Sequence, residues 1–159
     1  SVGKIQVNPV ADASVDERRP DTNFGYRPVL EVDGNFSKQV FMKFNIGSII
    51  GKQILTAELN LRVANFARAN QNIRFVDNSN WKEEEITYNN RPATGEIFGK
   101  INATSSQFGR WMKVKLDASA IPTVDKNLSI EIESPDKQAF HLFSRDSNFR
   151  PQLTVEYVK

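Results

Sequence analysis

The residues best suited to chemistry are a group of cations near the start of the chain. The group consists of Arg18, Arg19, Arg27 and Lys43, with Asn23 and Tyr26 among them. Guanidinium groups bind carboxylates bidentately, while amides and aromatic faces suit the hydroxyls and the C–H surface of a sugar. The group therefore indicates a site for a uronic-acid chain. The alternative is a solvated loop whose arginines pair with Asp12, Asp16 and Glu17.

Groups that could drive a reaction are few. The chain has one histidine, three tyrosines and no cysteine, and it lacks a nucleophile elbow, a phosphate loop and a His-Glu-x-x-His motif. His141 lies between Phe140 and Leu142 in a predicted strand, so we expect it on the exposed face opposite them. There it is either an ordinary surface histidine or part of a sugar-binding surface. Arg145 has the same two interpretations, as a solubilising surface charge or as a ligand contact. We predict no catalytic residue.

The acidic residues suggest two further kinds of site. Glu83, Glu84 and Glu85 could be the acid pair of a glycosidase. Adjacent residues on one strand cannot place two carboxylates on either side of a sugar, however, so a solvated loop is the simpler interpretation. A second set has oxygen ligands of the kind that calcium prefers, namely Asp12, Asp16, Asp21 and Asn23. Their spacing is not that of a calcium loop, so turn formation explains them better. We predict no cofactor and no metal ligand, with a structural calcium ion as the unsupported alternative.

The elements that must position these residues are strands. Apolar residues alternate with polar ones in Phe41 to Ile46 and in Ala57 to Val63, which is the pattern of a strand with one buried face and one wet face. The same alternation marks residues 112–116, 128–132 and 153–157, and shorter candidates are 7–13, 29–32, 73–76 and 139–144. Asp33-Gly34 predicts a hairpin turn, and 117–121 predicts one short helical turn. The chain is expected to be a single all-β domain over residues 1–159, an antiparallel β-sandwich or jelly roll.

Composition limits the class of partner. The net charge of +2 is too small to indicate a nucleic-acid-binding protein, and the aromatic and basic signatures of RNA-binding modules are missing. No apolar run approaches the roughly 18 residues needed to cross a bilayer, so no membrane insertion is expected. We expect a monomeric module, processed or cut from a longer chain.

Several motifs resemble those of the DNRLRE-type domain. The strongest is Trp81 to Pro92, which is similar to that family's Trp-x-Glu-x-x-Ile/Leu-Thr-Trp/Tyr-Asn-x-x-Pro signature. The others are Ala11-Asp12 with Pro20 to Tyr26, the strands Leu30 to Val32, Phe41 to Ile46 and Ile54 to Leu61, and the ending Phe143 to Asp146 with Arg150 to Val155. Asn45 and Asp146 replace the family's common Asp and Glu. The resemblance covers nearly the whole chain.

The resemblance implies a non-catalytic β-sandwich module on a secreted or cell-surface protein. One branch of that family consists of carbohydrate-binding modules that recognise alginate beside polysaccharide lyase domains. It implies ligand contacts from Arg18, Arg19, Arg27 and Lys43, with a C-terminal Tyr or Arg in addition, and a structural role for Trp81. The expected partners are an acidic polysaccharide and an attached lyase or hydrolase.

Two other functions compete with this expectation. Jelly-roll lyases also act on alginate, and His141, Arg145 and Tyr26 would then be the candidate residues, although the lyase Gln-x-His motif is not found. The second alternative is a structural or adhesive cell-surface domain without a sugar site.

Overall fold

The computed structural model describes residues 1–68 and 70–159, and within them the chain forms eleven strands that all pair antiparallel. The strands are β1 (Val2–Val7), β2 (Ala11–Asp16), β3 (Val29–Asp33), β4 (Lys38–Asn45), β5 (Ile54–Ala67), β6 (Gln71–Val76), β7 (Ile97–Ile101), β8 (Trp111–Leu116), β9 (Asn127–Glu133), β10 (Ala139–Phe143) and β11 (Gln152–Val158). Three short 3-10 helices interrupt the connections: η1 (Gly47–Ile49), η2 (Ser105–Gln107) and η3 (Ala118–Ala120). The all-β, antiparallel expectation is confirmed.

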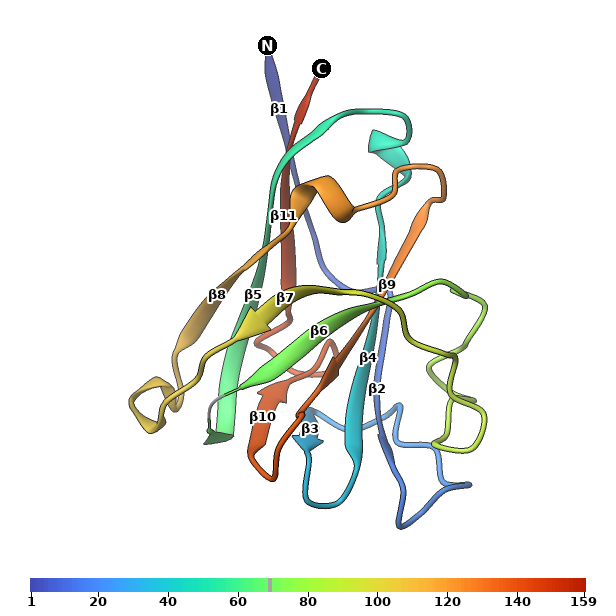
Figure 1. Cartoon of the computed structure of the whole chain (residues 1–159), viewed down its shortest axis with the longest axis vertical. Coiled ribbons are helices and arrows are strands. Elements are labelled where there is room, and N and C mark those ends of the chain that lie inside the picture. Colours follow the sequence, from blue (N-terminus) through green and yellow to red (C-terminus); the bar gives the residue numbers. More distant parts are fainter. Residues whose placement is uncertain (69) are drawn as a thin grey trace.

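The strands form a closed, barrel-like circuit. It runs from β5 through β10, β3, β4, β9, β6, β7 and β8 and returns to β5, while β1 and β11 extend it on one side and β2 adds to β4 (Figure 1). Two of its joins are single residue pairs, Asp33 with Lys38 and Gly99 with Leu116. The circuit is therefore closed weakly at these two places, and it encloses the core.

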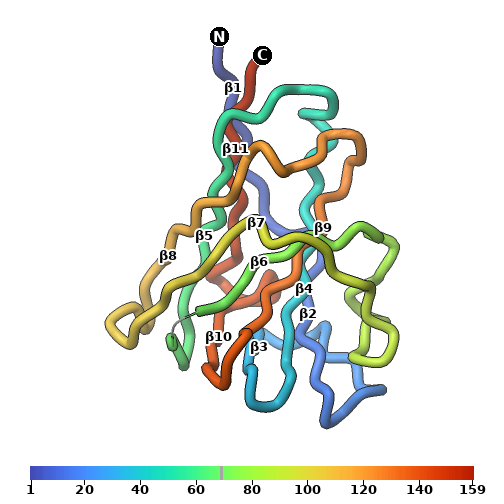
Figure 2. The backbone as a smooth tube through the Cα atoms, in the orientation of Figure 1, coloured from blue at the N-terminus to red at the C-terminus, as the bar shows by residue number. Residues whose placement is uncertain are grey.

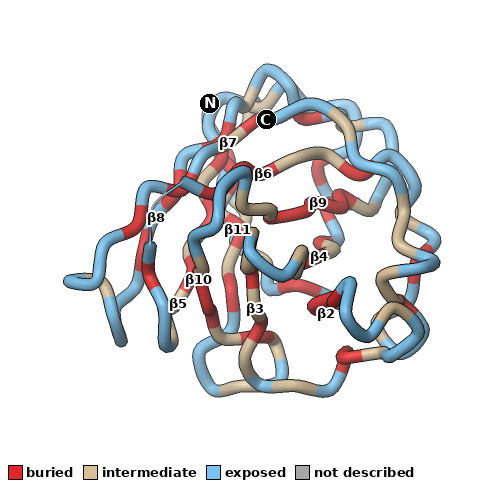
Figure 3. The backbone as a smooth tube through the Cα atoms, turned by 60° about the horizontal axis from the view of Figure 1, so that its bottom comes forward, coloured by how far each residue is buried: buried red, intermediate tan, exposed pale blue. Residues whose placement is uncertain are grey.

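The main core follows from the alternation in the sequence. On β4 the inward residues Val40, Met42 and Phe44 are fully buried, and β5 contributes Leu59 and Leu61 in the same way. Figure 3 shows the buried residues gathered on the strands, with most exposed residues on the connecting loops. Burying such side chains contributes about 1.5–3 kcal/mol each.

A second, smaller apolar cluster covers the other face of β2 and β4. It consists of Ala11, Ala13, Val15, Phe41, Val76, Trp81 and Ile86. Trp81 packs edge-on against Phe41, with ring centroids 6.1 Å apart, and its indole Nε1 donates to the hydroxyl of Ser129 at 3.1 Å. The expectation that the second face of the Phe41 to Ile46 strand is wet holds at Asn45, which is exposed, but is wrong at Phe41 and Lys43. There the segment between β6 and β7, which carries Trp81, folds over the strand. The expected structural role of Trp81 agrees with this packing.

Other local expectations had mixed outcomes. The predicted 7–13 strand is wrong, since β1 ends at Val7 and β2 begins at Ala11. Strand β7 was not expected. The predicted helical turn at 117–121 corresponds to η3, and the Asp33-Gly34 turn joins β3 to β4. Among the described residues no helix is long and apolar enough to cross a membrane.

The two ends of the chain lie together at one pole of the molecule (Figure 2). Val2 pairs with Val158, and the amide of Lys159 donates to the carbonyl of Ser1 at 3.1 Å. The loop of residues 17–28 and the β3–β4 hairpin lie at the opposite pole (Figure 1). The cationic residues of the sequence analysis thus belong mainly to the pole away from the termini.

Candidate carbohydrate-binding site

Strand β2 separates two different environments. Ala11, Ala13 and Val15 point into the cluster around Trp81, so by the period of two the alternate residues point to the opposite face. These alternate residues are Asp12, Ser14 and Asp16, and all three are buried polar residues. The hydroxyl of Ser14 accepts a hydrogen bond from the amide of Glu31 at 2.8 Å and so links β2 to β3.

A pocket of about 120 Å³ opens beside this link. Its lining comes from β2, from β3, from the first residue of β4 and from the 17–28 loop, and consists of Ser14, Val15, Asp16, Arg18, Arg19, Phe24, Arg27, Val29, Glu31 and Lys38. The structure therefore brings together Arg18, Arg19 and Arg27, as the sequence analysis expects. We call this feature the arginine pocket.

Aromatic rings orient two of the guanidinium groups. Arg18 lies 3.9 Å from the ring centroid of Phe36, and Arg27 lies 4.5 Å from that of Phe24. A guanidinium that stacks on a ring through its face keeps its N–H groups at the edge available for acceptors. Among the described residues, neither Arg19 nor Arg27 takes part in an ion pair, whereas Arg18 Nε lies 3.7 Å from Asp16 Oδ1.

Two carboxylates offset part of the positive charge. Lys38 Nζ lies 2.7 Å from Glu31 Oε2 and 4.0 Å from Asp16 Oδ2. Burial alone would raise the pKa of Glu31, but the hydrogen bond and the charge of Lys38 lower it, so this carboxylate stays ionised. Three arginines and one lysine against two acids leave a net charge of +2 on the lining.

Lys43 lies elsewhere, against the segment that carries Trp81. Its ammonium group donates to the carbonyl of Trp81 and sits 4.6 Å from the indole centroid, and burial lowers its pKa. The basic residue of β4 that reaches the arginine pocket is Lys38, which the sequence analysis missed. The hairpin signal at Asp33-Gly34 could have identified it, since that turn returns the start of β4 to the end of β3.

Asn23 and Tyr26 take different positions in the 17–28 loop. The amide of Asn23 donates to the carbonyls of Glu83 and Ile86 at 2.7 and 2.8 Å, and its oxygen accepts from the amide of Gly25. These bonds tie the loop to the segment that follows Trp81. Tyr26 is 69% exposed and is not part of the pocket lining.

His141 and Arg145 are not on an open surface. His141 is 8% exposed, against the expected exposed position, because the ring of Phe66 covers it with centroids 4.8 Å apart. Burial lowers its pKa, although the charge of Glu31 opposes this, and its Nδ1 has no hydrogen-bond partner among the described residues. The guanidinium of Arg145 is half-buried and donates to the carboxylate of Glu83 and to the carbonyl of Pro9.

The residues considered as calcium ligands do not come together. Asp16 lines the arginine pocket, Asp21 accepts from the side chain of Asn89, and Asn23 is used as described above. Asp12 meets two other acids, Glu83 and Asp146, which are distant in the sequence. The expectation that residues 83–85 form a solvated loop holds for Glu84 and Glu85 only, because Glu83 is half-buried.

Comparison with solved structures finds a distant likeness. One similar structure is that of the N-terminal endo-1,4-beta-D-xylanase 10B of Clostridium thermocellum, comprising its CBM22-1 and GH10 modules complexed with xylohexaose. The two chains are 9% identical with a TM-score of 0.38, and the match covers 93% of this chain but only 26% of the xylanase chain. No curated protein matches the sequence.

A family model matches almost the full length of the chain. The model is that of carbohydrate-binding module family 96, and the match extends over residues 3–157. It takes in the arginine pocket, the segment that carries Trp81 and all eleven strands apart from the end residues Val2 and Val158. The chain belongs to carbohydrate-binding module family 96 and is a non-catalytic carbohydrate-binding module.

Proposed function

We propose that the arginine pocket binds an acidic polysaccharide and that alginate is its ligand. The observation that carries this proposal is the convergence of Arg18, Arg19, Arg27 and Lys38 on one pocket with a net positive charge. A uronate carboxylate would accept charge-assisted hydrogen bonds from the guanidinium edges, each worth about 1.5–3 kcal/mol. A neutral glycan offers no partner for this excess charge.

The size of the pocket agrees with a polymeric ligand. A volume of about 120 Å³ is well below the roughly 300 Å³ at which pockets begin to enclose a whole small molecule. We infer that the sugar chain lies across the mouth and inserts one carboxylate, while the exposed ring of Tyr26 is available to a neighbouring sugar.

The biological setting of the proposal comes from the family and from the resemblance to DNRLRE-type domains. A carbohydrate-binding module that holds alginate would keep an attached lyase or hydrolase on its substrate outside the cell. We therefore propose an extracellular module with a catalytic neighbour in the same protein.

The proposal is tested by charge reversal with a matched control. The double variant Arg19→Glu and Arg27→Glu removes the two arginines without an ion-pair partner among the described residues. We expect it to weaken alginate binding at least about 100-fold, since two charge-assisted hydrogen bonds are lost. Isothermal titration calorimetry and gel retardation measure the change.

The control variant is Lys52→Glu and Lys126→Glu, which makes the same change in net charge at two exposed positions. It should bind as the unaltered protein does, and binding by both should weaken as salt rises. Equal losses in the two variants would mean that only overall charge matters and that the pocket is not the site. A glycan array that retains no acidic polysaccharide would favour a structural or adhesive domain instead.

A further inference from the structure

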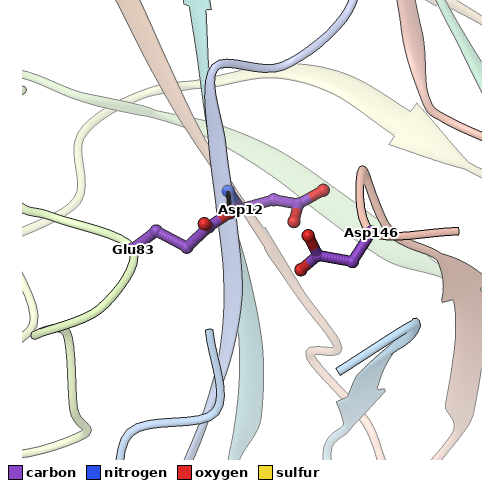
Figure 4. A group of neighbouring side chains, drawn as sticks. All are labelled: Asp12, Glu83 and Asp146. Atoms are coloured by element: carbon purple, nitrogen blue, oxygen red, sulfur yellow. Dashed lines mark hydrogen bonds between the residues drawn. The ribbon is translucent and has the colours of Figure 1, made fainter. Parts of the chain in front are cut away.

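Three carboxylates from distant parts of the chain meet beside β2. Asp12 comes from the strand itself, Glu83 from the segment after Trp81, and Asp146 from the loop after β10. Their ligand oxygens all lie within 4.8 Å of one another. Figure 4 shows the side chains of Asp12 and Asp146 pointing toward one another, with Glu83 approaching from the other side.

One oxygen of the Asp12 carboxylate has no hydrogen-bond partner in the part of the chain that the structure describes. The residue is only 1% exposed, its Oδ2 accepts from the amide of Arg145 at 2.9 Å, and its Oδ1 has no partner among the described residues. A buried carboxylate oxygen without a partner is costly, since water no longer solvates it. A hydrogen-bond donor or a cation bound at this position would give Asp12 Oδ1 a partner.

The charges around Asp12 do not balance. Arg145 is the cation of the cluster, and its Nη1 lies 3.2 and 3.1 Å from the two oxygens of Glu83. Three carboxylates and one guanidinium give a net charge of −2 when all are ionised. Burial, followed by the charges of Glu83 and Asp146, raises the pKa of Asp12 to about 7, against the hydrogen bond and charge of Arg145.

We propose that Asp12, Glu83 and Asp146 form a binding site for a divalent cation, and that the cation is calcium. An ion of charge +2 neutralises the cluster and gives Asp12 Oδ1 its partner. The ligands are all hard oxygens, and calcium holds 6–8 of them at about 2.3–2.6 Å in irregular arrangements, so two of its ligands can stand roughly 5 Å apart. Magnesium demands a tighter octahedron of about 2.0–2.1 Å.

The site would also hold the arginine pocket in place. The carbonyl of Glu83 accepts from the amide of Asn23, and a Cβ added at Gly25 would lie 2.0 Å from that carbonyl oxygen. The 17–28 loop therefore packs directly on the backbone of a proposed calcium ligand. Cation binding itself does not depend on the identity of the sugar.

The test is thermal unfolding of the chelator-treated protein with and without calcium chloride, in the absence of any glycan. Calcium at about 100 times its dissociation constant should raise the melting temperature by about 5–10 °C, and calorimetry should show a single saturable site. Magnesium chloride should give a markedly smaller shift. The proposal would be overturned if calcium up to about 10 mM, well above the dissociation constants of the weakest extracellular calcium sites, gave neither a shift in melting temperature nor heat of binding. An equal shift with magnesium would overturn the choice of calcium.

Variants separate a calcium ligand from a merely structural residue. Asp146 is exposed, so the variant Asp146→Asn should fold normally. Without calcium it should be at least as stable as the unaltered protein, because the substitution removes a negative charge that repels Asp12. It should lose the calcium-dependent shift. Glu85→Gln removes the same charge at an exposed position outside the cluster and should keep the full shift. An unchanged shift in Asp146→Asn would show that the ligands are wrong.

Discussion

At the scale of single residues, Glu131 on β9 shows how burial couples the fold to pH. Burial and the charge of Glu133 raise its pKa from 4.5 to about 7, although Arg74 and Arg91 oppose the shift. Its Oε1 has no hydrogen-bond partner among the described residues. Between these two pKa values the folded state retains a proton that the unfolded state has released, so the free energy of unfolding falls as pH rises.

The prediction for Glu131 concerns the size of that fall. The difference between the two pKa values corresponds to roughly 3 kcal/mol of stability, which is lost between about pH 4.5 and pH 7. Glu131→Gln should remove this share of the pH dependence and be the more stable protein at pH 8. Urea denaturation at a series of pH values measures it. Glu85→Gln, at an exposed position, serves as the control, and parallel curves for Glu131→Gln and the unaltered protein would contradict the assignment.

At the scale of elements, the 17–28 loop depends on the segment that follows Trp81. Asn23→Ala removes two hydrogen bonds to the carbonyls of Glu83 and Ile86 and leaves both carbonyls without this partner. We expect a loss of about 1–3 kcal/mol in the free energy of unfolding together with weaker alginate binding. Denaturant titration and calorimetry are the measurements. Asn35→Ala, in the exposed β3–β4 turn, should change neither quantity.

Elements with unbroken alternation could be predicted from the sequence. Strands β4, β5, β8, β9 and β11 carry regular apolar positions. β8, β9 and β11 were expected within one residue of their observed bounds, whereas β4 and β5 are longer than expected and begin three residues earlier. Strand β7 was missed because Gly99 interrupts its pattern, and a Cβ at that position would lie 2.7 Å from the side chain of Leu116. β1 was missed except for Val7, and the 7–13 prediction runs across the break between β1 and β2, because local alternation cannot show that β1 pairs with β11 and β2 with β4.

The candidate site could be predicted only where its residues are close in sequence. Arg18, Arg19 and Arg27 share one loop, so their clustering was visible, whereas the replacement of Lys43 by Lys38 depends on how Trp81 packs over β4. The cluster of Asp12, Glu83 and Asp146 joins residues more than sixty positions apart. Such proximity is set by tertiary packing and leaves no local pattern.

At the scale of the whole molecule, the two poles are expected to behave independently. We expect a circular permutant of residues 1–159 to fold and to keep its alginate affinity within about twofold when Lys159 is joined to Ser1 by about five Gly and Ser residues and the new ends lie between Val124 and Asp125. Val124 is 86% exposed and lies outside the pocket lining. Calorimetry and thermal unfolding check both properties. A permutant opened between the exposed Asp21 and Thr22 should instead lose binding, and equal affinities would place the site elsewhere.

The pairing of β1 with β11 determines how the module responds to mechanical load. Their ends lie side by side, with Val2 opposite Val158. Tension applied between the two ends would therefore peel the strands apart one backbone hydrogen bond after another, which requires little force because the bonds are loaded singly. Tension between one end and a ligand held at the far pole would instead run along the length of the strands and load many bonds at once. A higher force is therefore expected to unfold the module when it is pulled between a bound polymer and one terminus than when it is pulled between Ser1 and Lys159.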